Sequence, residues 1–236
     1  MKRDGAGERA KRHAGERAAE AVEDGAVVGL GTGSTAAYAI RALGRKVDTG
    51  LDIEGVPTSF QARALAREVG IPLTDLEAAT PDVAIDGADQ VAYGPGGASA
   101  PATALVKGGG AAHAREKYVD AAADRLLVVV DPSKEADALD HPVPVEVLPD
   151  ARRVVADRVR ELGGDPNLRA AERKDGPVVT DNGNLVTDAD FGTVDDPDAL
   201  AAALSGVPGV VEHGLFVGLA DAVVVGTADG ATLRDA

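Results

Sequence analysis

The chain of 236 residues is long enough for one large α/β domain or for a domain that carries a smaller insert. It has 24 lysines and arginines against 39 aspartates and glutamates, and the resulting net charge of −15 argues against nucleic acid as a partner. No apolar run reaches the length of a membrane span, residues 1–20 are charged throughout, and cysteine is absent. We therefore expect a cytoplasmic protein without membrane contact or disulfides.

The acidic excess favours a halophilic surface, on which carboxylates keep the chain soluble and salt screens their repulsion. Aromatic residues make up only 3% of the chain, so the core must consist of Ala, Val, Leu and Ile. Such small and branched side chains are typical of parallel strands enclosed by helices.

The first part of the chain alternates between short apolar segments and longer amphipathic ones. The apolar segments are predicted strands: 26–30, 51–56, 81–86 and 125–131. The segments between them are predicted helices: 9–23, 34–43, 59–70 and 111–123. This alternation predicts an α/β fold with a doubly wound, mostly parallel, Rossmann-like sheet and helices on both faces.

From residue 142 the pattern changes to that of a small α+β unit. Strand, helix, extended, helix and strand segments follow in order: 142–148, 150–164, 167–173, 177–183, 184–191, 195–206 and 210–216. This β-α-β-β-α-β order is typical of a ferredoxin-like domain. A last strand at 220–227 is expected to return to the first sheet. We predict a catalytic domain of residues 1–140 plus 217–236, and an inserted small domain, 141–216, that serves as a lid or in oligomerisation.

Ligands of open α/β sheets bind beyond the carboxyl ends of the strands, so the residues at these ends are the candidates for chemistry. They form a set rich in hydroxyls, carboxylates, lysines and glycines: Thr32–Thr35, Asp86–Asp89, Lys107–Gly110, Asp131 and Lys134, with Glu116 on the helix after Gly110.

The segment Gly31–Thr35 is a glycine-rich turn before a helix, which suits a phosphate monoester because N–H groups and hydroxyls converge there. A tight turn with a capping hydroxyl explains it equally well. A third reading is a dinucleotide fingerprint, since Gly31, Gly33 and Ala36 fit G-x-G-x-x-[GA] and Asp52 or Glu54 could take the ribose.

Asp86 and Asp89 enclose Gly87 and Ala88 directly after an apolar strand. Two carboxylates there suit hydroxyl recognition and proton transfer, or a divalent cation, although acidic pairs arise easily in so acidic a chain. The four histidines are scattered, so we expect no metal site.

Lys107 precedes three glycines, Gly108, Gly109 and Gly110, which lose much backbone entropy on folding and permit close approach to a ligand. Glu116 lies about two turns into the following helix. By spacing alone it is an ordinary surface partner of Arg115 or Lys117.

Taken together, these motifs strongly resemble the ribose-5-phosphate isomerase A family. The resemblance runs in order through nearly the whole chain: GLGTGSTA (29–36), GVPTSFQA (55–62), DVAIDGAD (82–89), LVKGGGAAHAREK (105–117), VVVDPSK (128–134), PVPVEVLP (142–149), VTDNGNLVTD (179–188) and GVPGVVEHGLF (206–216). It implies an aldose–ketose isomerase of the non-oxidative pentose phosphate pathway, which interconverts ribose 5-phosphate and ribulose 5-phosphate through an enediolate without a metal or cofactor.

The resemblance also assigns roles to residues. Glu116 matches the catalytic base, Asp86 or Asp89 the group that assists ring opening, and Lys107 a stabiliser of the enediolate. Substrate contacts are matched by the following residues: Thr32, Gly33, Ser34, Thr35, Asp86, Gly87, Ala88, Asp89, Lys107, Gly108, Gly109, Gly110, Lys134 and, in the first helix, Lys11. The family likeness further suggests a homodimer or homotetramer.

Two departures from the family pattern stand out. The segment 90–106 is longer than expected, and its Gly-Pro-Gly-Gly and Ala-Ser-Ala-Pro stretches predict an extended surface loop; Gln90 stands where we expect Glu. The rivals to an isomerase are a non-enzymatic sugar-phosphate sensor, a deaminase or CoA transferase on a related sheet, and a nicotinamide dehydrogenase.

Overall fold

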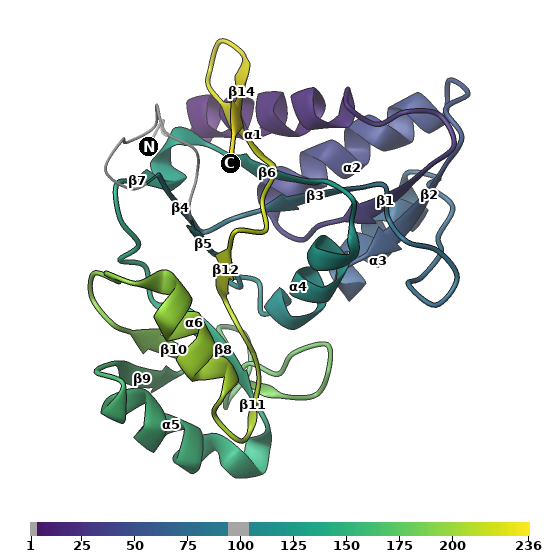
Figure 1. The fold of residues 1–236 in the computed structure, drawn as a ribbon. Coiled ribbons are helices and arrows are strands. Elements are labelled where there is room, and N and C mark those ends of the chain that lie inside the picture. Colours follow the sequence, from purple (N-terminus) through teal and green to yellow (C-terminus); the bar gives the residue numbers. More distant parts are fainter. Residues whose placement is uncertain (1–3, 94–103) are drawn as a thin grey trace.

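The computed structural model describes residues 4–93 and 104–236, and within them the largest sheet has six strands in the order β14-β13-β6-β3-β1-β2 (Figure 1). The inner strands of this sheet run parallel to one another, and β14 pairs with β13 in the antiparallel direction. The strands are β1 (Ala26–Leu30), β2 (Ile53–Pro57), β3 (Val83–Gly87), β6 (Leu126–Val130), β13 (Ala222–Gly226) and β14 (Ala231–Asp235). The predicted mostly parallel α/β sheet is confirmed, and β14 is an additional edge strand.

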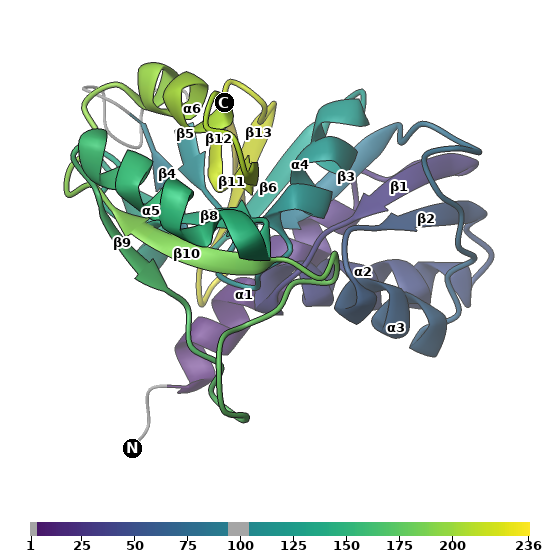
Figure 2. The same cartoon turned by 90° about the horizontal axis from the view of Figure 1, so that it is seen from below.

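Helices cover both faces of this sheet, but unequally (Figure 2). One face packs against α1 (Asp4–Ala19), α2 (Ser34–Val47) and α3 (Phe60–Glu68). Successive side chains of a strand point to opposite faces. Accordingly Leu127 and Val129 of β6 face these helices, whereas Val128 and Val130 belong to the core on the other side. That other side is covered by α4 (His113–Ala122) and by a second, smaller sheet.

The second sheet, in the order β12-β5-β4-β7, is not foreseen in the sequence. Its strands are β4 (Gln90–Ala92), β5 (Ala104–Val106), β7 (Glu135–Ala136) and β12 (Leu215–Val217). The expectation of a loop over 90–106 is therefore wrong at both ends of this segment, where strands of three residues are too short to show a period. The Gly-Pro-Gly-Gly and Ala-Ser-Ala-Pro stretches lie in 94–103, outside the described residues.

The inserted unit has the predicted β-α-β-β-α-β order and is called the small domain (residues 141–216) below. Its elements are β8 (Val143–Val147), α5 (Arg152–Glu161), β9 (Asp165–Leu168), β10 (Leu185–Asp190), α6 (Pro197–Ser205) and β11 (Val210–His213). The sheet has the order β11-β8-β10-β9, every neighbouring pair is antiparallel, and valines of β8 pack against α5 and α6.

Two predicted extended segments of the small domain differ in the structure. Segment 177–183 is a loop that pairs only through isolated bridges at Pro177 and Val179. The predicted strand 210–216 is two strands, because the chain leaves one sheet for another at Gly214. The Gly214 N–H donates to the carbonyl of Pro144 (2.7 Å), and the Gly214 carbonyl accepts from the N–H of Lys107 (2.8 Å). A Cβ on Gly214 would lie 2.1 Å from the Lys107 carbonyl oxygen, so only glycine fits.

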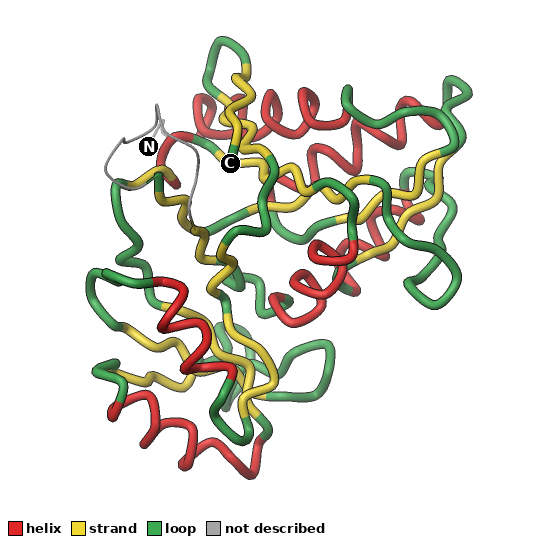
Figure 3. Tube along the Cα trace, viewed as in Figure 1, coloured by secondary structure: helices red, strands yellow, loops and turns green. Residues whose placement is uncertain are grey.

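The loop between β9 and β10 projects from the small domain toward the α/β domain (Figure 3). Its tip is built on Glu146 of β8, whose fully buried carboxylate accepts hydrogen bonds from Thr180 Oγ1 (2.9 Å), Asn182 Nδ2 (3.0 Å) and Asn184 Nδ2 (2.8 Å). The Gly183 N–H donates to the Thr180 carbonyl (2.9 Å) and Val179 bridges Leu185 in the antiparallel direction, so the Thr-Asp-Asn-Gly-Asn sequence forms a tight hairpin turn, which the side-chain bonds to Glu146 hold in place.

The same loop touches two helices of the α/β domain. Asp181 Oδ2 accepts from the backbone N–H of Phe60 at the start of α3 (2.7 Å). Asn182 Oδ1 accepts from Arg115 Nε on α4 (2.7 Å). The small domain is thereby fixed against the elements that bear the residues described next. None of the helices in 4–93 and 104–236 has both the length and the apolar character of a membrane span.

Candidate active site

A cavity of about 280 Å³ opens at the carboxyl ends of β1, β3 and β6, where the sequence predicts the chemistry. Its wall comes from segments far apart in the chain: Lys11, Thr32–Thr35, Gly87–Asp89, Lys107–Gly110, Glu116, Asp131, Ser133 and Lys134. The structure thus brings together all of the expected site residues around one space, with the exception of Asp86, which lies behind the wall.

The Thr32–Thr35 segment turns from β1 into α2. Gly33 has a φ of +110°, a backbone conformation that residues with a side chain rarely adopt. It is the N-cap residue of α2 and has no side chain that could cap the first N–H groups of the helix. These groups carry the positive end of the helix dipole. Thr32 Oγ1 is held by Thr58 Oγ1 (2.8 Å) and Ser59 Oγ (2.6 Å). The turn therefore offers free N–H groups and the positive end of a helix dipole, an arrangement suited to an anion.

Asp86, at the end of β3, is completely buried. Its Oδ1 accepts from the N–H groups of Thr32 (3.0 Å) and Gly87 (2.6 Å), and its Oδ2 lies 2.9 Å from Lys107 Nζ. A Cβ on Gly31 would collide with this carboxylate at 2.2 Å, which explains the glycine at that position. Asp86 therefore connects the anion-binding turn to the lysine that faces the cavity.

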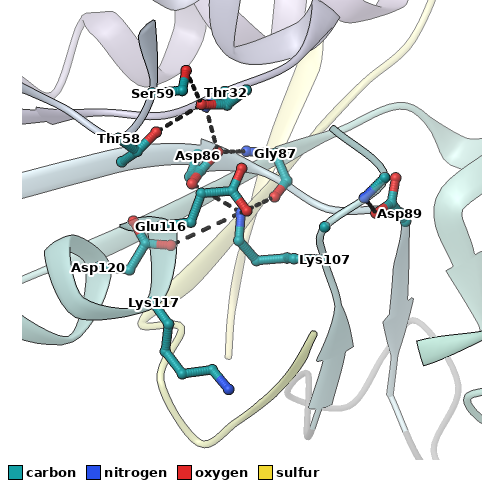
Figure 4. Close-up of polar contacts among 12 residues, drawn as sticks. Thr32, Thr58, Ser59, Asp86, Gly87, Asp89, Lys107, Glu116, Lys117 and Asp120 are labelled. Atoms are coloured by element: carbon teal, nitrogen blue, oxygen red, sulfur yellow. Dashed lines mark hydrogen bonds and ion pairs between the residues drawn. The ribbon is translucent and has the colours of Figure 1, made fainter. Parts of the chain in front are cut away.

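Lys107 is 1% exposed and lies among carboxyl groups (Figure 4). Besides Asp86, its Nζ is 3.7 Å from Glu116 Oε2 and 3.9 Å from Asp120 Oδ2, and it donates to the carbonyl of Gly87 (2.5 Å). Burial alone would lower the pKa of Lys107, but the three carboxyl groups outweigh it and raise that pKa. The site thus holds a fixed positive charge at one side of the cavity.

Glu116 lies one turn into α4, is 4% exposed and lines the cavity. Its Oε2 accepts no hydrogen bond from the described part of the chain. Burial, together with the charge of Asp86, raises the pKa of Glu116 to about 8, and Lys107 counteracts only part of the shift. A carboxyl with a pKa near neutrality is suited to take up and return a proton at physiological pH. The surface role that spacing alone favoured is therefore wrong.

Asp120, one turn beyond Glu116, is part of this cluster and was missed in the sequence. Its side chain is 1% exposed, and burial together with the charge of Asp86 raises the pKa of Asp120 well above its ordinary value. The signal was available, because Glu116 and Asp120 are four residues apart and so share one face of a helix. Lys117, between them, points away and binds Glu212 Oε1 (2.6 Å) and the carbonyl of His213 (2.6 Å) (Figure 4).

The rest of the wall is polar. Asp89 Oδ2 accepts from the N–H of Gly109 (2.6 Å), which joins two of the predicted motifs (Figure 4). Asp131 accepts from the backbone N–H of Ser133 (2.9 Å), and this turn leads to Lys134. Asp131 was a strand-end candidate to which no role was assigned, and Ser133 was not foreseen. Lys11 reaches the cavity from α1, with Glu8 Oε1 3.4 Å from its Nζ.

Two alternative interpretations of the sequence do not fit this geometry. Asp52 and Glu54 lie at the amino end of β2, with Asp52 beside Gly25, whereas the Gly31–Thr35 turn lies at the carboxyl end of β1. A dinucleotide bound at this turn could not reach either carboxylate. The described residues contain no group of three or more His, Cys, Asp or Glu side chains that could hold a metal ion.

Gln90, the departure from the family pattern, does not line the cavity. Its side chain joins β4 to the start of the small domain: Oε1 accepts from the N–H groups of Asp140 and His141 (both 2.9 Å), and Nε2 donates to Asp140 Oδ1 (2.5 Å). The amide supplies both a donor and an acceptor here, which an ionised Glu could not.

Comparison with known proteins agrees with the geometry. Residues 54–230 match the sequence model of the family described as ribose 5-phosphate isomerase A (phosphoriboisomerase A). A ribose-5-phosphate isomerase A of Haloarcula marismortui is 67% identical over 230 residues, which cover 98% of this chain and 97% of that protein.

Solved structures agree as well. Ribose 5-phosphate isomerase A of Methanocaldococcus jannaschii is 43% identical, with a TM-score of 0.89 over 96% of this chain and 98% of that one. A D-ribose-5-phosphate isomerase in complex with phospho-erythronic acid is 42% identical, also with a TM-score of 0.89, over 96% and 97% of the two chains.

Proposed function

Because the chain belongs to the ribose 5-phosphate isomerase A family, we propose that its cavity interconverts D-ribose 5-phosphate and D-ribulose 5-phosphate, with Glu116 as the base. The observation that carries this assignment is the buried Glu116 carboxyl on the cavity wall, whose pKa is raised to about 8, 3.7 Å from the ammonium of Lys107. The reaction is an aldose–ketose isomerisation of the non-oxidative pentose phosphate pathway, and it needs a base and a stabiliser of an oxyanion at adjacent positions.

The substrate phosphate would occupy the N-terminal turn of α2. Hydroxyls of Ser34 and Thr35 and the free N–H groups of the helix are the donors there, and Lys134 and Lys11 supply positive charge. This local concentration of cations explains how a chain with a net charge of −15 can bind an anionic sugar.

The proton transfer follows from the positions of Glu116 and Lys107. In the open-chain aldose, Glu116 removes the proton from C2, and the C1 carbonyl oxygen becomes the enediolate oxygen. A proton then passes from the C2 hydroxyl to the C1 oxygen, so that C2 becomes the ketone, and the same carboxyl returns its proton to C1. Lys107 and the N–H groups of the glycine loop (Lys107–Gly110) stabilise the negative charge that develops on oxygen. No redox partner is involved, since the oxidation of C2 balances the reduction of C1.

The two aspartates would have different roles. Asp89 lines the cavity and can exchange protons with the sugar oxygens during ring opening. Asp86 is sealed behind Lys107 and is proposed to hold that ammonium in place. We assign Asp86 to positioning rather than to direct contact with the sugar.

We also propose the division into a catalytic domain (1–140 and 217–236) and a small domain (141–216). The protein is further proposed to form a homodimer or homotetramer, in which the small domain contributes to subunit contacts or covers the site.

A cytoplasmic location is proposed because a charged sugar phosphate does not cross a bilayer unaided and must share a compartment with its enzyme. The charge of −15 and the likeness to the Haloarcula marismortui protein support a halophilic surface.

The test is the formation of ribulose 5-phosphate from ribose 5-phosphate in molar KCl with EDTA present. Glu116→Gln keeps the size and polarity of the side chain but removes the base, so kcat should fall by about 10²- to 10⁴-fold while binding of inorganic phosphate is retained. An unchanged kcat in this variant would refute the assignment of the base. Loss of wild-type activity in EDTA would refute a reaction without metal.

A further inference from the structure

The small domain, all of which the structure describes, contributes no residue to the cavity wall, yet one of its side chains reaches the wall from behind. Arg169, just after β9, donates from NH1 to the carbonyls of Gly108 (2.9 Å) and Gly109 (3.1 Å). These are the central carbonyls of the glycine loop. The contact therefore connects the small domain directly to the backbone that surrounds the reacting sugar.

The guanidinium of Arg169 is itself fixed. Its Nε donates to Asp188 Oδ2 on β10 (2.9 Å), and its NH2 pairs with the other carboxylate oxygen of Asp188. Such a two-point pair of planar groups defines the orientation of the arginine as well as its position. Arg169 and Asp188 side chains are 17% and 30% exposed, so the pair is largely shielded by protein.

A glycine loop needs such a restraint because it has no side chains to hold it and much conformational freedom. In this loop the Gly109 N–H is directed to Asp89 and the Ala111 N–H to the Gly108 carbonyl. The Ala111 backbone has a φ of +57°, which is unfavourable for a residue with a Cβ. The surrounding contacts must therefore impose this conformation.

The restraint has a definite consequence for the next N–H group. In a trans peptide the C=O and N–H bonds point in opposite directions, and the described residues have no cis peptide. Because the Gly109 carbonyl is directed to Arg169, the Gly110 N–H points away from it. Gly110 lines the cavity, and its N–H donates no hydrogen bond to the described part of the chain. It is a free donor at the site.

We propose that Arg169, oriented by Asp188, is a positioning residue for the isomerisation: it fixes the Gly108 and Gly109 carbonyls so that the Gly110 N–H donates to the enediolate oxygen. This inference rests on the proposed function, since it needs an oxyanion to form in this cavity. A donor aimed at developing charge stabilises the transition state more than the ground state. Arg169 should therefore affect kcat more than the binding of the phosphate group.

The test compares Arg169→Met, Arg169→Lys and Asp188→Asn with the control Arg173→Met. Arg173 is exposed, lies four residues further along the same loop and carries the same charge, so its loss controls for electrostatics. For each folded protein, kcat and KM for ribose 5-phosphate are measured, together with dissociation constants for phospho-erythronic acid and for inorganic phosphate by calorimetry. The carboxylate of phospho-erythronic acid stands in for the enediolate oxygens.

We expect Arg169→Met to lower kcat by about 10- to 100-fold and to weaken the binding of phospho-erythronic acid by a similar factor. The affinity for inorganic phosphate should stay within about twofold of wild type. Arg169→Lys should recover only part of the loss, because an ammonium cannot serve both carbonyls and pair with both oxygens of Asp188. Asp188→Asn should lower kcat less, and its effect should disappear in the Arg169→Met background.

The inference would be overturned if Arg169→Met had the same kcat and KM as Arg173→Met. It would also be overturned if Arg169→Met weakened the binding of inorganic phosphate and of phospho-erythronic acid by the same factor. If Arg169→Met does not fold, Asp188→Asn and Arg169→Lys decide by the same criteria. An inactive wild-type protein would instead refute the proposed function, which separates the two failures.

Discussion

The raised pKa of Glu116 predicts a particular pH dependence of activity. As a base, Glu116 must be ionised, and burial together with Asp86 raises its pKa to about 8. Roughly 3% of the carboxyl is then ionised at pH 6.5, about 10% at pH 7 and half at pH 8. We expect kcat/KM to rise about 15-fold from pH 6.5 to pH 8 and to level off above pH 9. The range begins above the second phosphate pKa of about 6, so titration of the substrate contributes little.

The same group predicts how stability changes with pH. In the unfolded chain Glu116 has its ordinary pKa of 4.5, so between pH 4.5 and about 8 the folded state binds a proton that the unfolded state has lost. The stabilisation is complete below pH 4.5 and is lost as pH rises to about 8, by up to about 1.4 kcal/mol per pH unit. Glu116→Gln lacks this titration and is the matched reference.

Urea unfolding of both proteins at constant molar KCl measures the effect. The free energy of unfolding of the wild type, relative to the variant, should fall steadily from pH 5 to pH 8. Two results would refute the reasoning: an activity profile with its midpoint near pH 4.5, or a difference in unfolding free energy that does not change over this interval. Either would mean that water or Lys107 neutralises the effect of burial on Glu116.

Three further substitutions test separate parts of the structure. Lys134→Ala, at the polar wall, should raise KM for ribose 5-phosphate several-fold with little change in kcat, and an unchanged KM would argue against a phosphate contact. Gly31→Ala should lower the free energy of unfolding by about 1–3 kcal/mol and reduce activity, because the new Cβ would lie 2.2 Å from Asp86 Oδ1. A variant as stable as the wild type would contradict this crowding. Glu146→Ala leaves the donors of Thr180 and two asparagines unpaired, so it should lower the free energy of unfolding by about 2–4 kcal/mol. A decrease of less than about 0.5 kcal/mol in urea unfolding would show that water replaces the carboxylate.

The parallel sheet could be predicted because its strands are five-residue apolar runs separated by amphipathic helices. The strand 26–30 agrees with β1 residue for residue. The ends of α1 were predicted less well: the helix begins at Asp4 and ends at Ala19, not at 9 and 23. Its charged first turns carry no apolar period, and small alanines alone do not mark where it stops.

The second sheet could not be predicted, for a different reason. Strands such as β7, two residues long, exist only because a neighbour supplies their hydrogen bonds, and no local pattern announces them. Gly214 shows the same limit. The sequence 210–216 reads as one strand, and only the close approach of Lys107 explains why it divides into two.

For the site, strand ends and glycine loops were sufficient to find almost the entire cavity wall. They could not separate Asp86 from Asp89, since a three-residue spacing does not tell which carboxylate becomes buried behind Lys107. Nor could they find Arg169, which contacts the glycine loop through carbonyl oxygens and lies 61 and 60 residues from the two glycines that it binds.

The joint at Gly214 also bears on how substrate enters and leaves. Its N–H is bound to the small domain at Pro144 and its carbonyl to the backbone of Lys107, so a swing of the small domain would have to break the second bond or displace the lysine. A hinge-like opening that kept both bonds would shift the backbone of Lys107 and so disturb the charge cluster around its side chain at each turnover. We therefore expect sugar phosphates to enter and leave the cavity by diffusion while its walls stay in place. The small domain would then support the site rather than open and close over it.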